Sequence, residues 1–147
     1  MYKRILVPTD GTALSKKAVK SAVELAATFG AEVVALNVVP RYPRSYFEGG
    51  LVISVADVKR VEEQWTAQGQ ALVDEVGKAA DKAGVKAKAV TVRSDLVAEA
   101  ILAAARKNKC DLVVMASHGR KGLKRLLLGS ETQHVLTHGN IPVLVLR

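Results

Sequence analysis

The chain is poor in residue types that several common functions need. Its one cysteine, Cys110, excludes an internal disulfide and any metal cluster built from several thiolates. We expect Cys110 to be a small residue at the start of a strand and not a reactive thiol. Aromatic residues make up 4% of the sequence, which argues against a base-stacking surface for single-stranded nucleic acid.

Long apolar runs are missing as well. No run approaches the roughly 20 residues that span a bilayer, which predicts a protein without a membrane helix. The apolar stretch behind Lys3 and Arg4 stops at Pro8 and is too short for a secretory signal, so we expect a cytoplasmic location. The pattern G-x-x-x-x-G-K-[ST], a G-x-G-x-x-G behind the first strand, and G-x-S-x-G are all absent. The chain is therefore not a P-loop enzyme.

Positive charge is what the sequence has in excess. It carries 22 basic and 14 acidic residues and a formal net charge of +8. Such a surplus attracts polyanions, among them nucleic acid, an anionic membrane or a phosphorylated small molecule. Because no nucleic-acid-reading motif accompanies the charge, we rank nucleic acid low among the partners.

Five apolar runs alternate with segments of helical periodicity. Strands are expected at residues 3–7, 32–38, 86–92, 111–115 and 142–146, and helices at 14–29, 56–83, 97–107 and 130–138. Gly30 is expected to end the first helix. Residues 40–54 have no clear period and are expected to form a loop. The alternation predicts one α/β domain over residues 1–147, with an open, doubly wound parallel sheet and helices on both faces, as in Rossmann-like folds.

Ligands of open α/β sheets bind beyond the carboxyl ends of the strands. Thr9 and Asp10 follow the first strand, and a carboxylate there can accept hydrogen bonds from a ribose or an adenine amine. The alternative for both residues is turn chemistry and capping of the first helix. The first loop alone leaves both interpretations open.

The stretch from Met115 to Gln133 follows the fourth strand. Its glycines and basic residues are Gly119, Gly122, Gly129, Arg120, Lys121, Lys124 and Arg125. Glycines let a ligand approach the main chain, and the N-terminus of the helix at Ser130 predicts an anion site. A capping box with Ser130 as N-cap and Gln133 at N3 fits too, as does a solvated basic face. His118 is expected to shape the loop or to lie near a phosphate.

Two further histidines, His134 and His138, lie four residues apart on the last predicted helix. No Glu or Cys completes a ligand set beside them, so their spacing alone does not predict a metal site. The helix dipole is a sufficient reason for a histidine at the position of His138.

From end to end, the sequence resembles the universal stress protein family. The resemblance rests on KRILVPTD at residues 3–10, LNVV at 36–39, the glycine loop, and IPVLVL at 141–146. The family's nucleotide-binding branch carries G-x2-G-x9-G-[ST] after its fourth strand. Here these positions hold Ala116, Gly119, Gly129 and Ser130. If the first position needs a left-handed backbone, alanine costs about 1–2 kcal/mol there; if it needs only room, one methyl group narrows the pocket.

The resemblance implies the strand order 3-2-1-4-5 and an adenine nucleotide across the ends of the first and fourth strands. The ligand would be ATP, ADP or AMP. Magnesium could accompany it, and the protein would supply no ligand to the metal. The residues implied at the nucleotide are Pro8, Thr9, Asp10, Val38, Met115, Ala116, His118, Gly119, Gly129, Ser130, Glu131 and Thr132. The resemblance also implies a homodimer through the last strand, a short apolar edge that would otherwise invite uncontrolled pairing.

We therefore predict a stress-response or signalling module that binds an adenine nucleotide and acts on protein partners that the sequence does not identify. Without an obvious general base or paired metal carboxylates, ATP hydrolysis is expected to be slow at most. The main alternative is a nucleotide-free interaction module of the same family, which Ala116 favours. A third possibility is an ATP-dependent enzyme of the wider adenine-nucleotide α-hydrolase-like group, for which the short chain leaves little room.

Overall fold

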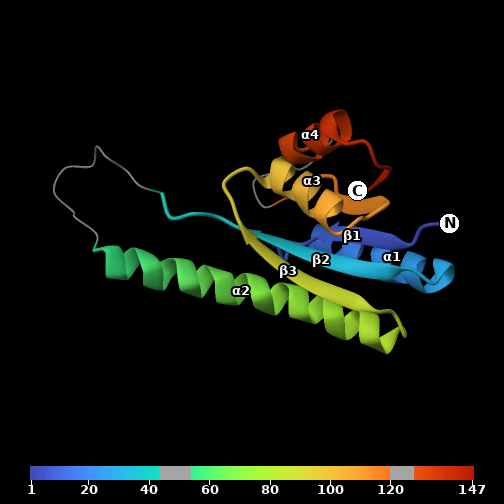
Figure 1. The fold of residues 1–147 in the computed structure, drawn as a ribbon, viewed down its shortest axis with the longest axis horizontal. Helices are drawn as coiled ribbons and strands as arrows, with labels where there is room; N and C mark the ends of the chain where they lie inside the picture. The colour runs from blue at the N-terminus through green and yellow to red at the C-terminus, as the bar shows by residue number, and fades with distance from the viewer. Residues whose placement is uncertain (44–53, 120–127) are drawn as a thin grey trace.

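The computed structural model describes residues 1–43, 54–119 and 128–147 (Figure 1). The strands are β1 (Arg4–Pro8), β2 (Glu32–Val39), β3 (Ala87–Arg93), β4 (Leu112–Ala116) and β5 (Val143–Leu146). The helices are α1 (Ala13–Phe29), α2 (Val55–Lys82), α3 (Val97–Lys107) and α4 (Ser130–His138). The strands pair in parallel in the order β3-β2-β1-β4-β5. The predicted fold class and strand order are confirmed.

The ends of α1 are set by local chemistry. Thr12 is the N-cap, and its hydroxyl oxygen accepts a hydrogen bond from the Ser15 N–H at 3.2 Å. Gly30 ends the helix as predicted, because its φ of 66° is a left-handed conformation that glycine adopts without strain. The same logic starts α2, where the Ser54 hydroxyl accepts from the Asp57 N–H at 3.1 Å.

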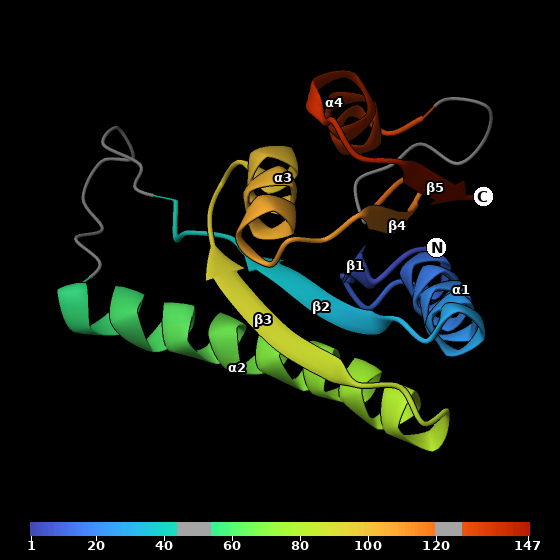
Figure 2. The ribbon, with the colours of Figure 1, turned by 45° about the vertical axis from the view of Figure 1, so that its right-hand side comes forward.

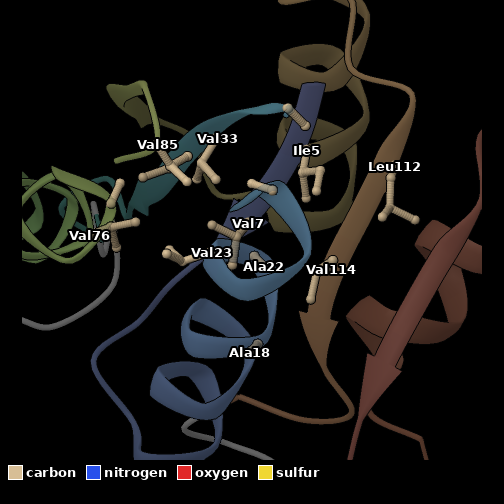
Figure 3. Packing of buried hydrophobic residues seen from close by; sticks show 14 of the residues in the cluster. Ile5, Val7, Ala18, Ala22, Val23, Val33, Val76, Val85, Leu112 and Val114 are labelled. Carbon is tan, nitrogen blue, oxygen red and sulfur yellow. The ribbon is translucent and has the colours of Figure 1, made fainter. Parts of the chain in front are cut away.

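Helices cover both faces of the sheet, with α1 and α2 on one side and α3 and α4 on the other (Figure 2). On the first side, small residues of α1 such as Ala18 and Ala22 lie against Val7 and Val114 of the central strands (Figure 3). Because alanine is small, α1 comes close to the sheet. The second side has its own buried cluster. It includes Leu6, Leu36, Ile101, Val113, Met115 and Val135.

Helix α2 is longer than the sheet face that it covers. Its buried residues, Gly69, Val73, Val76 and Ala80, all lie in its C-terminal half. The N-terminal half extends beyond the sheet (Figure 1), so only the C-terminal half of this helix has buried residues. In that half, Trp65 stacks on Tyr42 with ring centroids 6.0 Å apart.

Two predicted features lie largely outside the described residues: the loop at 40–54 and the basic cluster at 120–125. Across the described ranges, no helix is both long and apolar enough to cross a membrane.

Cys110 lies just before β4, as expected, and the structure shows that it is buried. Burial raises the pKa of its thiol from 9.0 to about 11. At pH 8 the reactive thiolate is therefore about 100-fold rarer in the folded protein, and we expect thiol labelling to slow by at least that factor relative to the unfolded chain. The shift also lowers stability as the pH rises from 9.0 towards 11, because only the unfolded chain ionises there. Labelling with a chromogenic thiol reagent, with and without urea, tests this; equal rates would contradict it.

Candidate functional site

The loop after β1 begins with a buried threonine. The Thr9 N–H donates to the Leu36 carbonyl at 2.8 Å, which continues the sheet pairing by one residue. Its hydroxyl lies 3.3 Å from the Ser15 hydroxyl at the start of α1. Thr9 is 7% exposed, so its side chain is part of the framework beneath the loop. The N-cap of α1 is Thr12, so Thr9 supports the start of this helix through the Ser15 hydroxyl and does not cap it.

Asp10 links this loop to the loop after β4. Its Oδ1 accepts from the Thr12 N–H at 3.0 Å and from the Thr12 hydroxyl at 2.6 Å, which forms a side-chain turn in front of α1. A Cβ atom on Gly119 would lie 3.0 Å from Asp10 Oδ2. A glycine at position 119 thus lets the main chain of the second loop approach the carboxylate. The two loops that were predicted to share a site meet at this point.

Asn37 is a site residue that the sequence reasoning missed. It lies on β2 beside β1, is 9% exposed, and donates from Nδ2 to the Thr9 carbonyl at 2.8 Å. This bond holds the chain immediately before Asp10. Its signal in the sequence was one polar residue in the otherwise apolar run VVALNVV, since a buried amide in a strand needs a specific partner.

The loop after β4 is closed at its base by hydrogen bonds. The Ser117 carbonyl accepts from the Gly129 N–H at 2.7 Å and from the Thr132 hydroxyl at 3.1 Å. The same hydroxyl lies 3.0 Å from the Ala116 carbonyl. A Cβ on Gly129 would lie 3.2 Å from the Ser117 carbonyl oxygen and from His118 Cα, so the two ends of the loop can come this close because residue 129 is glycine.

The N-terminus of α4 differs from the predicted capping box. The N-cap is Gly129, one residue earlier than expected, and Ser130 is the first helical residue. Gln133 donates from its side chain to the Leu128 carbonyl at 3.0 Å and does not bond back to Ser130. Close packing at the loop base favours glycine as the N-cap over serine. Since glycine supplies no side-chain acceptor, the first-turn N–H groups keep their capacity to bind an anion.

Two residues predicted at the nucleotide have side chains engaged elsewhere. The Thr132 hydroxyl is used at the loop base, and the residue is 1% exposed. Glu131 Oε2 accepts from the Ala98 N–H at 2.8 Å, in the first turn of α3. The N-cap of α3, Leu96, makes no side-chain cap bond, so Glu131 supplies the missing acceptor from a neighbouring helix.

We expect Glu131→Ala to lower the free energy of unfolding by about 1 kcal/mol, the usual cost of losing a helix cap. Urea unfolding followed by circular dichroism measures this. Glu99→Ala is the matched control, because Glu99 is an exposed carboxylate in the first turn of α3. Its removal should lower the free energy of unfolding by only a few tenths of a kcal/mol. Equal effects of the two changes would mean that the contact with Ala98 contributes nothing specific.

The remaining predicted residues line the same edge of the sheet. Val38 is half-buried and Met115 is buried, and both pack with the cluster under α3 and α4. Pro8 ends β1 in register with Leu36. His118 Nδ1 lies 3.3 Å from the Ser117 hydroxyl oxygen, which keeps the ring beside the base of the loop. Ser130 is exposed at the start of α4.

Ala116, which stands where the motif has glycine, is the last residue of β4 and is in register with Leu146 of β5. Among the described non-glycine residues only Lys109 has a positive φ, so Ala116 is not in a left-handed conformation. The alternative in which alanine is strained at this position is wrong. The remaining effect of Ala116 is the space that its methyl group takes.

The Ala116→Gly variant is therefore expected to lose about 0.5–1 kcal/mol of stability, because a strand glycine costs conformational entropy and no strain is relieved. Chemical unfolding of both proteins checks the sign. A more stable variant would restore the strained-backbone explanation.

Comparison with known proteins agrees with this architecture. The sequence model of the Universal stress protein family matches residues 1–147. This chain belongs to the universal stress protein family. Universal stress protein MJ0531 of Methanocaldococcus jannaschii is 36% identical over 147 residues, which cover 100% of this chain and 83% of that protein.

Solved structures of universal stress proteins share the fold. UspA from Lactobacillus plantarum superposes with a TM-score of 0.84 at 22% identity, covering 99% of this chain and 98% of that one. A universal stress protein in complex with cAMP has a TM-score of 0.72 at 26% identity and covers 99% of this chain and 97% of its own. In the described part of the present chain, no cluster of three or more His, Cys, Asp or Glu residues suits a metal ion.

Proposed function

We propose that this universal stress protein binds an adenine nucleotide between the loops that follow β1 and β4, and that the bound nucleotide regulates its contacts with protein partners in the cytoplasm. One observation carries the proposal. Asp10 Oδ2 and the main chain of Gly119 approach one another where the strand order reverses, and the α4 N-terminus begins at the base of the same loop. The cAMP complex of a relative with 26% identity supports this ligand class.

Each end of the nucleotide has suitable chemistry on this edge. The Asp10 carboxylate accepts hydrogen bonds from ribose hydroxyls or an adenine amine, while Pro8, Val38 and Met115 offer apolar contact to the base. The phosphates bind main-chain N–H groups of Gly119 and of the first turn of α4, where the helix dipole favours negative charge. Glu131 and Thr132 contribute main-chain N–H groups of this first turn. Their side chains bond to α3 and to the base of the loop and so help to position it. Magnesium, where present, enters with the phosphates.

The test begins with what the purified protein already holds. Denaturing it and identifying released molecules by chromatography and mass spectrometry is expected to yield an adenine nucleotide at a substantial fraction of one per chain. Emptied protein is then titrated with ATP, ADP, AMP and cAMP, each with and without MgCl₂. Saturable binding to one of them supports the site, and the series identifies the preferred phosphate number. No binding at millimolar concentrations of any of the four would refute the proposal.

The second candidate function is a nucleotide-free module that acts through self-association and partner binding. The observation that favours it is β5, which lies at the edge of the sheet, pairs with β4 alone in the described sheet, and leaves Leu144 40% exposed. An exposed edge strand is a template for pairing with another chain. We propose that β5 of a second copy pairs there, with or without nucleotide.

Sedimentation of the wild type and of Leu144→Lys distinguishes the two candidates when combined with the titration. A dimer that dissociates in the variant, in a protein that binds none of the four nucleotides, is the result expected of the interaction module. A monomeric wild type at all concentrations would exclude pairing through β5.

A further inference from the structure

The two histidines of α4 form a pair that the nucleotide site does not use. His134 and His138 lie one helical turn apart, and their rings stack with centroids 4.1 Å apart and an angle of 23° between the planes. His134 is half-buried and His138 is exposed. The rings are therefore held side by side at the surface, near the end of the helix opposite to the glycine loop.

Hydrogen bonds determine which nitrogen of His138 carries the proton. Its Nδ1 lies 3.1 Å from the His134 carbonyl oxygen and 2.9 Å from the Thr137 hydroxyl oxygen. A carbonyl oxygen can only accept, so Nδ1 donates and Nε2 keeps a free lone pair. The Thr137 hydroxyl in turn lies 2.9 Å from the Gln133 carbonyl, to which it donates, and it can accept from His138. An imidazole anchored through one N–H to a backbone carbonyl is the usual state of a metal-ligating histidine.

We propose that His134 and His138 together bind one divalent transition-metal ion, of the class of Zn²⁺, Ni²⁺ or Cu²⁺, through an imidazole nitrogen of each ring. Two histidines four residues apart lie on one face of a helix and can bind one such ion together, once the rings turn so that a nitrogen of each faces the ion. The helix dipole accounts for a histidine at position 138 but not for a second ring stacked on it. The spacing was visible in the sequence; the stacking and the Nδ1 bond are what the fold adds.

The ligand set decides the class of ion. Imidazole nitrogen suits zinc, nickel and copper, whereas magnesium and calcium prefer oxygen ligands. In the part of the chain that the structure describes, no third His, Cys, Asp or Glu joins the pair into a larger cluster. The remaining coordination positions are therefore taken by water or by an outside ligand. His134 and His138 lie about 6 and 12 Å along α4 from Ser130, at 1.5 Å per residue, and the nucleotide proposal uses neither ring.

Isothermal titration of nucleotide-free protein with ZnCl₂, NiCl₂ and CuSO₄ tests this, with MgCl₂ as the negative ion. We expect one transition-metal ion to bind per chain when the metal is titrated to about 200 μM. Copper should bind most tightly, and magnesium should not bind. His134→Ala and His138→Ala should each weaken binding about tenfold or more. His118→Ala is the matched control, because it also leaves two histidines but keeps the pair, and it should bind zinc as the wild type does.

A second readout separates loss of a ligand from loss of structure. Zinc should shift the imidazole NMR signals of His134 and His138 and leave that of His118 unchanged, and thermal unfolding verifies that the alanine variants fold. If a variant unfolds, the corresponding glutamine variant replaces it. The proposal is overturned if the wild type binds none of the three ions, if one of the two alanine variants binds as tightly as the wild type, or if His118→Ala loses as much affinity as they do.

Discussion

The Gly69→Ala variant is expected to be less stable than the wild type by about 1–3 kcal/mol, although alanine is the better helix former. Gly69 is buried on α2 where the helix crosses β2. An added Cβ would overlap Asn37 Oδ1 and would lie 3.1 Å from Asn37 Cγ and from Val39 Cγ2. Asn37 cannot simply turn away, because its Nδ2 donates to the Thr9 carbonyl. The helix must move off the sheet or that buried bond must break, and both lower stability.

Gly77 of the same helix is the matched control. A Cβ at that position meets nothing within 4 Å, and its φ is not positive, so Gly77→Ala should raise stability by about 0.5–1 kcal/mol. Denaturant unfolding of the two variants should give changes of opposite sign. If Gly69→Ala were as stabilising as Gly77→Ala, the close approach of α2 to Asn37 would be absent in solution.

The consequences of Gly69→Ala should extend to the candidate site. Asn37 holds the carbonyl of Thr9, which immediately precedes Asp10, so displacing the amide loosens the loop after β1. On the proposed function, the variant should bind nucleotide more weakly than the wild type even under conditions where it is fully folded. Titration well below the melting temperature measures this.

The second large effect is expected from Asp10→Asn, which should lower nucleotide affinity about tenfold or more, the loss expected for a hydrogen bond to a charged group of about 1.5–3 kcal/mol. Asparagine keeps an oxygen that can accept from the Thr12 N–H and hydroxyl, so the turn before α1 is retained. The substitution removes the charge and places an amide where the carboxylate would meet ribose or adenine. Affinity is measured by titration with the nucleotide that the protein prefers.

Asp95→Asn is the control for this change. Asp95 is also a turn carboxylate that follows a strand, and its Oδ1 accepts from the Arg41 N–H at 3.0 Å. It follows β3, however, which is separated from β1 by β2 in the sheet. Its amide variant should bind nucleotide as the wild type does. If Asp10→Asn binds nucleotide as tightly as the wild type, Asp10 serves only the turn. The nucleotide then lies elsewhere on this edge.

The elements of the fold could be predicted because each has a local cause. Runs of Val, Ile and Leu indicated the five strands within one residue at either end, and the helical periodicity indicated all four helices. Gly30 ends α1 as predicted, since a left-handed residue at that point favours glycine in any tertiary context. The strand order came from the resemblance to a family and not from the pattern itself.

The site was predictable only down to the level of loops. Asp10 and Gly119 were both named, yet nothing in their local sequence says that a carboxylate and a glycine more than 100 residues apart come so close that an added Cβ would lie 3.0 Å from Oδ2. Ser130 was predicted as the N-cap from its residue type. Close packing at the base of the loop gives that position to Gly129 instead.

The sequence by itself thus determined which segments are strands and helices, which loops end at the same edge, and which family the chain resembles. Tertiary structure alone decided which side chains those loops use. In the folded chain, Glu131 accepts a hydrogen bond from the first turn of α3, and Thr132 donates one at the base of the glycine loop. Asn37 donates one to the Thr9 carbonyl. The reason is physical: periodicity and turn chemistry act within a few residues, whereas a buried polar group takes whichever partner the packed elements bring within hydrogen-bonding distance.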